Sequence, residues 1–561
     1  MAPEKNQGPE PSVRSRLASA IESALETMGI REASGDIQIE RPNDPGRGDL
    51  SSNIAMAAAK RMGGNPRELA GRLKDSIVLD AGFIDRVEVA GPGFLNFAFS
   101  KAWLTKQVEI INIEGRDYGR SEIGRGRKVQ VEYVSANPTG PLVIVAARAA
   151  AVGSALVNIL RKTGHEVESE YYLNDAGSQV RKLGVSLMTR FMQRLGQDVP
   201  FPEDGYPGGY LVDIAGLIPE EDGRLWLAKA PEESAAAFGE FALDHIIRWI
   251  RRDLDGFGVV FDNYFRESAL HAAGGGIGET LEIFKSGKAV YEDDGALWFR
   301  STDYGDEKDR VLVRSDGTPT YFLADAAYHL DKFRRGYSRV IDIFGPDHHG
   351  HIARLKAAAA VFGAPDGWLD IMTVQWVRLV EDGRQVKMSK RGGEFETLGS
   401  LVEDVGSDAS KFFFLMRKIN AHLDFNLTLA RKSSDENPVY YVQYAHARIC
   451  SVIAFAGEAG VRLPEDMSCV SLLEEPEELE LIRNLVIFPH LVEGAAESCE
   501  PHRLTGYAQQ LAASFHRFYH ICRIVSSDER LSQARLLLAE ASRIVLAESL
   551  GLLGVSAPDR M

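Results

Sequence analysis

Hydrophobic and polar residues follow three different patterns along this chain, and the first of them covers residues 1–115. Helical spacing and strand-like alternation both occur in this stretch, at 12–30, 36–42, 48–62 and 84–100. A tight turn at Gly91-Pro92-Gly93 folds the last alternating run back on itself. We therefore expect a small N-terminal α/β domain over residues 1–115.

From Lys128 onward, apolar strands alternate with helices. The alternating units lie at 128–136, 142–163, 166–175, 339–345, 350–363 and 369–380. Repeated β-α-β units build a parallel sheet, and the ligands of such sheets bind at the carboxyl ends of the strands. Residues 190–300 fit this alternation poorly and predict an insertion. The pattern indicates a Rossmann-like α/β domain with a parallel sheet over residues 116–400.

After residue 400, only helical spacing remains. It occurs at 429–460, 477–498, 502–524 and 532–554. We therefore expect an all-α C-terminal domain over residues 401–561. The predicted fold class is α/β, with a central parallel sheet between a small α/β domain and a helical domain.

Charge limits the kinds of partner that the chain can bind. Its 64 basic and 80 acidic residues give a net charge of -16, so a nucleic acid must be held by local basic patches. One cluster, at Arg120, Arg125, Arg127 and Lys128, lies in a glycine-rich linker at 114–128. This cluster is either a solvated linker or a phosphate contact.

Three features predict a cytoplasmic protein without a membrane anchor. The four cysteines form no CxxC pair, which favours reduced thiols over disulfides or zinc. Residues 1–16 lack the apolar core of a secretory signal. Residues 141–160 are long and apolar enough to span a membrane, but Arg148 and Asn158 favour a buried helix.

The string "VKMSKRGGEFETL" (386–398) combines cationic side chains with two glycines that let a loop close. Lys387 and Lys390 can sit over the phosphates of a nucleotide, and Ser389 can donate a hydrogen bond. A basic surface turn has the same composition. The run from Lys387 through Met388 to Lys390 resembles the signature loop of class I aminoacyl-tRNA synthetases.

Further strings narrow this resemblance to one family, the arginyl-tRNA synthetases of class Ia. Strings similar to that family are "VEYVSANPTGPL" (131–142), "YYLNDAGSQV" (171–180), "RVLVRSDGTPTYFLADAAYHLDKFRRG" (310–336), "GPDHHGH" (345–351), "HLDFNLTLARKSSDENPVYYVQYAHARI" (422–449) and "LGLLGVSAPDRM" (550–561). Two more, "RGDLSSNIAMAAAK" (47–60) and "VAGPGFLNF" (89–97), resemble its N-terminal tRNA-binding domain. The resemblance spans essentially the whole chain.

The resemblance implies an arginine–tRNA ligase. ATP and L-arginine would form arginyl-adenylate, and the arginyl group would then pass to the 3′ end of tRNA(Arg). Mg²⁺ would accompany the ATP phosphates, and we expect no structural metal. The N-terminal domain would grip the tRNA elbow, the C-terminal helices would read the anticodon, and the protein would be a monomer.

The resemblance also assigns residues to an arginine site, where carboxylates would meet the guanidinium and other acceptors the α-ammonium group. These residues are Glu132, Ser135, Asn137, Asp175, Tyr321, Asp325 and Gln375. Tyr321 and Asp325 stand four residues apart, so a helix would place both on one face. Either of them alone could also be an ordinary structural contact.

A second group of residues is assigned to ATP. It contains Val143, Ala146, Gly345, Asp347, His348, Lys387, Met388 and Lys390. His348, His349 and His351 beside Asp347 could suggest zinc, but their spacing is too compressed for one ion. We therefore expect no metal site there.

A third group of residues is expected to contact tRNA. It contains Tyr441, Gln443, Tyr444, Arg448 and Met561. Aromatic residues together with arginine can stack on unpaired bases and grip them. Packing of this helix into its own domain would explain the same aromatic residues.

One segment departs from the pattern of the family. After "NPTGPL" the family has His-x-Gly-His, whereas this chain has Val143, Val145 and Ala146 at those positions. The family's following arginine remains as Arg148, and the resemblance makes Arg148, Lys387, Ser389 and Lys390 catalytic. The two histidines would donate hydrogen bonds to the ATP phosphates, and loss of one such donor typically costs a factor of about 10²–10³ in rate.

Three hypotheses remain open on the sequence. The chain is an active arginine–tRNA ligase, or it is a catalytically impaired or inactive relative that still binds tRNA. A third hypothesis, an enzyme that adenylylates another small molecule, is weaker because strings similar to tRNA-binding modules occur at both ends.

Overall fold

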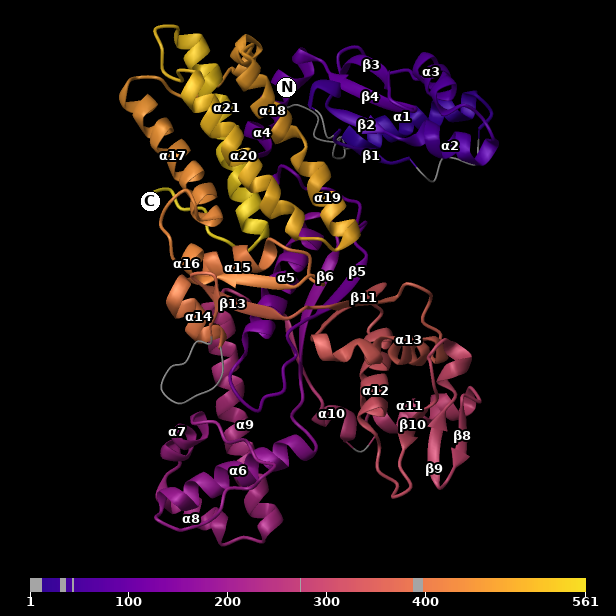
Figure 1. The fold of residues 1–561 in the computed structure, drawn as a ribbon, viewed down its shortest axis with the longest axis vertical. Coiled ribbons are helices and arrows are strands. Elements are labelled where there is room, and N and C mark those ends of the chain that lie inside the picture. Colours follow the sequence, from indigo (N-terminus) through magenta and orange to yellow (C-terminus); the bar gives the residue numbers. More distant parts are fainter. Residues whose placement is uncertain (1–12, 31–36, 43–44, 273, 387–396) are drawn as a thin grey trace, which may run out of the picture.

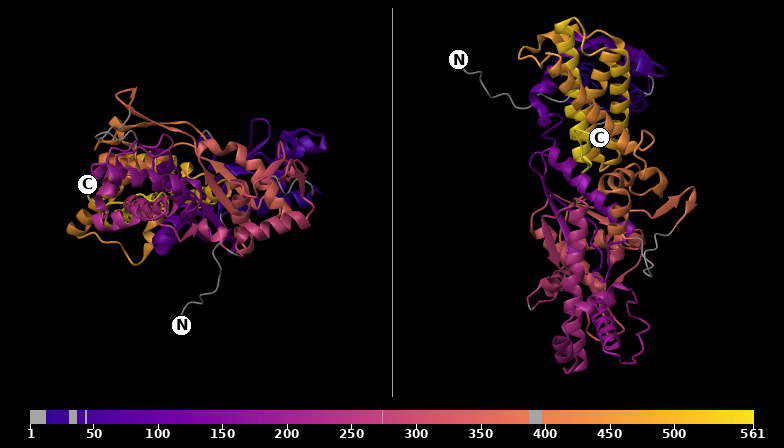
Figure 2. Two further views of the ribbon diagram at one scale, coloured as in Figure 1. Left: turned by 90° about the horizontal axis from the view of Figure 1, so that it is seen from below. Right: turned by 90° about the vertical axis from the view of Figure 1, so that its left-hand side faces the viewer.

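A computed structural model describes the chain apart from residues 1–12, 31–36, 43–44, 273 and 387–396. The described part is elongated, with a parallel sheet near its middle (Figure 1). An N-terminal α/β unit lies beside the C-terminal helices at one end, and two smaller lobes extend toward the other end (Figures 1 and 2).

The N-terminal unit is an antiparallel sheet covered by helices. Its strands, in spatial order, are β1 (Ile39–Glu40), β2 (Leu50–Ser52), β4 (Phe94–Phe99) and β3 (Ile84–Ala90). Helices α1 (Val13–Thr27), α2 (Ile54–Met62) and α3 (Pro66–Ser76) have buried apolar stripes. Helix α4 (Lys101–Glu114) then packs against two C-terminal helices, α18 (Pro476–Val486) and α21 (Glu529–Leu552).

Five parallel strands form the central sheet. In spatial order they are β12 (Leu369–Thr373), β11 (Arg339–Phe344), β5 (Lys128–Glu132), β6 (Glu166–Leu173) and β7 (Asn263–Arg266). Consecutive positions of β5 are buried, as expected for a parallel sheet that is covered on both faces. The predicted α/β class with a parallel sheet is confirmed.

Helix α5 (Ile144–Lys162) connects β5 to β6 and lies in the core of this domain. A Cβ atom at Gly153 would lie 2.2 Å from the Tyr133 ring, so only glycine allows this approach of helix and strand. Within the described residues, α5 alone is long and apolar enough to cross a membrane, and 78% of its most apolar window is buried in the protein. The prediction of a buried core helix is confirmed.

Two lobes interrupt the central sheet. Between β6 and β7 the chain forms α6 (Ser178–Arg194), α7 (Tyr210–Leu217), α8 (Glu220–Leu227) and α9 (Pro231–Gly256). Between β7 and β11 it forms α10 (Ser268–His271), α11 (Gly276–Ser286), β8 (Val290–Asp293), β9 (Ala296–Phe299), β10 (Arg310–Val313) and α12 (Tyr321–Arg334). Because β7 pairs with β6, the stretch 190–300 is not one continuous insertion.

The chain after β11 differs from the predicted pattern in two places. Helix α13 (Ile352–Val361) leads to β12 as expected, but the predicted strand 369–380 is two strands, β12 and β13 (Val377–Glu381). Strand β13 pairs with β14 (Arg384–Gln385) and β15 (Leu423–Asn426) in a second small sheet. Strand β15 was not predicted, because four residues are too few to display an alternation.

The remaining elements are helical. Helices α14 (Leu398–Val405), α15 (Ser407–Leu415) and α16 (Leu427–Ala430) surround the second sheet. Helices α17 (Pro438–Glu458), α19 (Phe488–Ser498) and α20 (His502–Ile521) form a bundle with α18 and α21. The expected helical C-terminal domain is confirmed from Pro438 onward, whereas strand β15 lies within the predicted all-α range of 401–561.

Candidate active site

A cavity of about 380 Å³ opens at the carboxyl ends of the central strands. Its walls come from the loops after β5 and β11, the first turns of α5, one face of α12 and the segment between β12 and β13. Of the residues predicted from the sequence, those that line it are Glu132, Ser135, Asn137, Val143, Ala146, Asp325, Gly345 and Asp347. This is the edge at which parallel sheets bind their ligands.

The loop that follows β5 is strained where it borders the cavity. Val134 and Ser135 adopt positive φ angles of 70° and 35°. Holding a non-glycine residue at a positive φ angle costs about 1–3 kcal/mol of folding free energy, so neighbouring contacts must hold the residue in place. One such contact is the backbone N–H of Tyr172, which donates to the Ser135 hydroxyl at 3.1 Å. The loop is thereby tied to β6.

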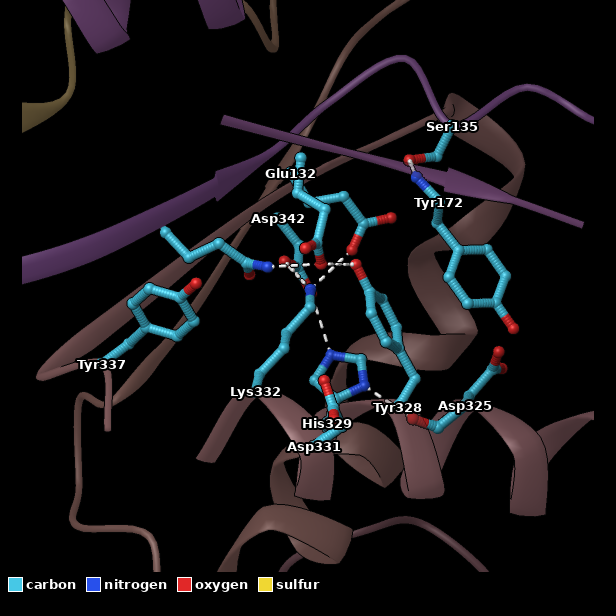
Figure 3. A network of polar contacts seen from close by, with 12 residues as sticks. Glu132, Ser135, Tyr172, Asp325, Tyr328, His329, Asp331, Lys332, Tyr337 and Asp342 are labelled. Atoms are coloured by element: carbon cyan, nitrogen blue, oxygen red, sulfur yellow. Dashed lines mark hydrogen bonds and ion pairs between the residues drawn. The ribbon is translucent and has the colours of Figure 1, made fainter. Parts of the chain in front are cut away.

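A buried ionic network lies beside the cavity (Figure 3). Nζ of Lys332 lies 2.5 Å from Oε2 of Glu132 and 2.8 Å from Oδ1 of Asp342. Nε2 of His329 lies 2.9 Å from Oδ2 of Asp342, and its Nδ1 lies 2.7 Å from the carbonyl oxygen of Asp325. Each ring nitrogen of His329 therefore has an oxygen within hydrogen-bond distance.

Burial and neighbouring charges act in opposite directions on the three carboxylates of this region. Burial raises the pKa of Glu132, and the ammonium group of Lys332 offsets this only in part. Burial also acts to raise the pKa of Asp342, but Lys332 and His329 hold it below its usual value. Asp325 forms no ion pair with a residue that the structure describes, and burial raises its pKa to about 6. Glu132 and Asp342 therefore each form an ion pair with Lys332, whereas Asp325 forms none with a described residue.

A second polar cluster holds α12 against β6. Buried Glu170 accepts hydrogen bonds from Gln130, Asn263, Tyr328 and Arg335. Burial acts to raise the pKa of Glu170, but the contact with Arg335 keeps it below its usual value. Tyr328 belongs both to this cluster and to the cavity wall. The cluster therefore fixes the position of one polar residue of the site.

The wall formed by the first turns of α5 is apolar. Val143, Val145, Ala146 and Ala149 line the cavity there, and none of them carries a side-chain hydrogen-bond donor. Val143 is the N-cap of α5; it is 42% exposed and forms no side-chain capping hydrogen bond. The backbone N–H groups of the first helical turn and the helix dipole still favour an anion at this wall.

The segment that begins at Thr397, directly after residues 387–396, lies beside this wall. Val143 forms an isolated β-bridge with Thr397, and the N–H of Leu398 donates to the carbonyl of Leu142 at 2.8 Å. Two segments far apart in the sequence therefore meet at the edge of the cavity. Outside the described residues lie Lys387, Met388, Ser389 and Lys390, and the side chain of His348 is not described either.

The structure does not bring Arg148 to the cavity. Its buried side chain donates to the carbonyl oxygens of Gln375, Lys418 and Ala421, at distances of 2.8 to 3.0 Å. Burial lowers the pKa of its guanidinium group to about 10. These contacts tie α5 to the segments before β13 and β15. We expected Arg148 to be catalytic. The structure instead gives it a structural role, because its guanidinium donates to three backbone carbonyls away from the cavity.

Two further residues expected in the arginine site, Asp175 and Tyr321, lie outside the cavity wall. The carboxylate of Asp175 accepts hydrogen bonds from Arg266 and from the backbone and hydroxyl of Ser268. Tyr321 is 52% exposed, and its hydroxyl lies 2.8 Å from Oγ of Ser178. These contacts occupy both polar groups away from the cavity.

Gln375 also points elsewhere. Its Oε1 accepts a hydrogen bond from the backbone N–H of Trp376, while Val374 and Trp376 line the cavity. Asn174 similarly lines the cavity in place of its neighbour Asp175. Sequence reasoning chose the right segments here, but the direction of each side chain depends on packing that those segments do not contain.

Sequence reasoning missed the part of the site that α12 provides beyond Asp325. Tyr328 and His329 line the cavity, and Lys332 lies behind them. These three residues follow Asp325 by three, four and seven positions. That spacing is the signal of one helical face, and it could have identified them from the sequence.

The C-terminal helices carry an aromatic stripe, which we define as Tyr440, Tyr444 and Arg448 of α17 and Tyr519 of α20. The rings of Tyr440 and Tyr444 are parallel, with centroids 6.3 Å apart. The guanidinium carbon of Arg448 lies 5.2 Å from the ring centroids of both Tyr444 and Tyr519. The residues of the stripe are partly exposed.

The other residues expected to contact tRNA lie in different surroundings. Gln443 is buried, and its amide donates to Asp408 and to the carbonyl of Ser556, which is a structural role. Tyr441 packs against the ring of His516 at 5.1 Å. Met561 is 51% exposed.

One group of described residues could hold a metal ion by proximity. The ligand atoms of His446, Cys450 and Asp559 lie within 4.8 Å of one another. Nδ1 of His446 already lies 3.0 Å from the carbonyl oxygen of Pro558, and the thiol of Cys450 lies 3.5 Å from Asp559. Hydrogen bonds that hold the C-terminal segment therefore account for this cluster.

The fold and the site together define a class of protein. A parallel sheet with a cavity at its carboxyl edge, followed by a helical bundle, is the architecture of the class I aminoacyl-tRNA synthetases. The structure of arginyl-tRNA synthetase from Thermus thermophilus has a TM-score of 0.79 to this chain, covers 98% of it and 100% of its own length, and is 24% identical. At this identity the likeness shows the fold alone.

Sequence comparison narrows the class to one family. The family models described as "Arginyl tRNA synthetase N terminal domain" and "DALR anticodon binding domain" match residues 15–99 and 442–561. The arginine–tRNA ligase of Moorella thermoacetica is 45% identical over 97% of this chain and 98% of its own length. The arginine–tRNA ligase of Heliobacterium modesticaldum is 46% identical over 98% of this chain and 99% of its own length. This chain belongs to the arginine–tRNA ligase family.

Proposed function

We propose that this chain is an arginine–tRNA ligase that binds L-arginine, ATP and tRNA(Arg). The second candidate is a relative that still binds these substrates but whose activation step is strongly impaired. In that step the arginine carboxylate attacks the α-phosphate of ATP, pyrophosphate leaves, and arginyl-adenylate forms. A terminal ribose hydroxyl of tRNA then takes the arginyl group. No covalent enzyme intermediate is needed, so catalysis consists of positioning and charge stabilisation.

Arginine binding is supported by the charge balance of the cavity. Arginine carries a guanidinium and an α-ammonium group, so it needs acceptors on more than one wall. Glu132 and Asp325 line the cavity from β5 and α12, and Asp325 lacks a partner among the described residues. Asn137, Ser135 and Tyr328 add polar groups around them.

The apolar α5 wall is the observation that favours the second candidate, the relative with impaired activation. Val143, Val145 and Ala146 line the cavity where the family resemblance places His-x-Gly-His. Two lost donors, at about 10²–10³ each, reduce the rate of activation by about 10⁴ or more when non-additivity is allowed for. The branched side chain of Val145 also narrows the space in which a flat base would pack.

Binding of ATP and tRNA depends on other parts of the chain. The Lys387–Lys390 loop and the N-terminus of α5 would hold the phosphates, and Mg²⁺ would accompany them as part of the substrate. The aromatic stripe would stack on unpaired bases of tRNA. We further propose a cytoplasmic monomer with domains at 1–115, 116–400 and 401–561.

Arginine-dependent ATP–pyrophosphate exchange, run with tRNA present and beside a tRNA-binding titration, tests this proposal. We expect exchange at a rate normal for the family, together with tRNA binding, as the family membership supports. Exchange near background with retained tRNA binding would instead favour the second candidate. Absence of both arginine and tRNA binding would overturn both candidates.

A matched variant checks the tRNA part separately. Tyr444→Ala removes one ring of the aromatic stripe, and stacking of a base on an aromatic ring is worth about 1–3 kcal/mol. We expect tRNA to bind about tenfold more weakly, with arginine binding unchanged because α17 does not line the cavity. The control is Tyr291→Ala, which removes one ring of the stacked Tyr291–Trp298 pair on the distant β8–β9 hairpin. This variant should leave tRNA binding unchanged.

A further inference from the structure

Lys332 is a buried cation that does not line the cavity and yet forms two ion pairs beside it. Its side chain has 0% exposure, and its Nζ contacts both Glu132 and Asp342. Removing an ammonium group from water is costly unless its partners compensate. Glu132 and Asp342 are register partners on the adjacent strands β5 and β11, so the two carboxylates would repel each other without this cation.

Lys332 also determines how α12 sits on the sheet. It follows Asp325 by seven residues, which is two helical turns, so the two side chains leave the helix on the same side. Its Nζ lies 4.3 Å from the centroid of the Tyr328 ring, and Figure 3 shows these side chains directed toward the strand ends. The ion pairs therefore join the wall that carries Glu132 to the wall that carries Asp325.

We propose that Lys332 is a positioning residue of the amino-acid site, which keeps Glu132 ionised and aimed at the cavity so that it can accept hydrogen bonds from cationic groups of arginine. This inference rests on the proposed binding of arginine. Lys332 itself does not touch the ligand, because Glu132, Tyr328 and His329 stand between it and the cavity.

The charges around Glu132 determine whether a substitution raises or lowers its pKa. Burial and the neighbouring Asp342 raise the pKa of Glu132, whereas Lys332 lowers it. The other titratable groups that face it are Tyr172 from β6 and Asp325, Tyr328 and His329 from α12. Glu170 acts on Lys332, and Asp347 and His351 stand on the cavity wall after β11. The α5 wall contributes no titratable group.

Arginine binding to the full-length chain, measured by calorimetry between pH 5 and pH 9, tests the inference without any need for activation. In Lys332→Met the protonated form of Glu132 should persist to higher pH. We expect arginine to bind about tenfold or more weakly at pH 7, and to recover part of its affinity as the pH rises. A merely structural role for Lys332 would lower the affinity equally at every pH.

A second variant has the opposite expected sign. Asp342→Asn removes the anion that raises the pKa of Glu132 and leaves Lys332 to Glu132 alone, so arginine binding should persist to lower pH than in the unaltered chain. This variant also keeps the inference testable if Lys332→Met fails to fold. Arg339→Met is the matched control, because it breaks an ion pair to Asp370 at the opposite end of β11 and should not move the pH profile.

Two outcomes contradict the inference, and they are distinguishable. If the unaltered chain binds arginine and neither the Lys332 nor the Asp342 variant shifts the pH profile, the positioning role is wrong while the proposed function stands. If the unaltered chain binds no arginine at any pH, the proposed function fails together with the inference. Opposite shifts in the two variants, with Arg339→Met unchanged, would establish the role.

Discussion

Two walls of the same cavity differ sharply in chemistry. The wall built by β5, β11 and α12 carries Glu132, Asp325 and His329, with Lys332 and Asp342 behind them. The facing part of α5 offers only valine and alanine side chains. The first wall is equipped to bind a cation, whereas the second retains only backbone groups for an anion. Polar and apolar side chains are therefore segregated to different walls of this cavity.

The apolar wall does not disturb the fold, because α5 is held by contacts elsewhere along its length. Gly153 packs against Tyr133, and Arg148 binds three backbone carbonyls. Val143, Val145 and Ala146 occupy only the first turn. Side chains at that end of a helix can change with little effect on the core, since they face the cavity.

The largest expected effect, on ATP–pyrophosphate exchange, comes from placing polar side chains on the apolar α5 wall. The triple variant Val143→His, Val145→Gly, Ala146→His restores two donors and removes one branched side chain. If the α5 wall impairs activation, ATP–pyrophosphate exchange in the presence of tRNA should rise by a factor of about 10⁴. Arginine affinity, measured by calorimetry, should remain unchanged because the polar wall is untouched. No gain in exchange would contradict an impairment by the α5 wall.

The second prediction concerns arginine affinity and tests whether the polar wall binds the amino acid. Asp325→Asn removes the carboxylate that has no ion-pair partner among the described residues, so arginine should bind about 10²-fold more weakly at pH 7. The unaltered chain should itself lose arginine affinity as the pH falls below about 6, the pKa to which burial raises Asp325. Calorimetry between pH 5 and pH 8 measures both changes. An unchanged affinity in the variant would remove Asp325 from the site.

The same variant should stabilise the ligand-free fold, in the direction opposite to its effect on binding. The folded pKa of Asp325, about 6, lies above the ordinary value of 3.8, so its charged form destabilises the folded state as the pH rises through that interval. We expect Asp325→Asn to raise the free energy of unfolding by about 1–2 kcal/mol at pH 7. The gain should disappear below about pH 4, and urea denaturation at both pH values checks it.

The smallest expected effect returns to the first residue of the apolar wall. Val143 occupies the N-cap of α5 with extended backbone angles, φ −88° and ψ 166°, and forms no side-chain cap. Val143→Ser supplies an oxygen for the free N–H groups and should raise the free energy of unfolding by about 0.5–1 kcal/mol. Val143→Ala, which offers no such oxygen, is the control. Equal denaturation curves for the two variants would contradict the capping argument.

Local patterns predicted the elements of the α5 wall closely. The strand before it and the helix at 142–163 agree with β5 and with α5 at Ile144–Lys162. The polar wall was harder to predict. Lys332 contacts Glu132 across 200 positions of sequence, and Arg148 contacts carbonyls 227 to 273 positions away. Such pairs leave no periodic signal in either segment, so Arg148 was assigned to chemistry and Lys332 was not assigned at all.

The sequence by itself determined the family and the absence of side-chain donors at 143, 145 and 146, because the identity of a side chain decides whether a donor exists. Only the tertiary structure decided which polar residues face the cavity. Asn174 lines it and Asp175 does not, although they are neighbours in the chain. The direction of a side chain depends on what packs around its backbone, and for this site those neighbours come from strands and helices hundreds of residues apart.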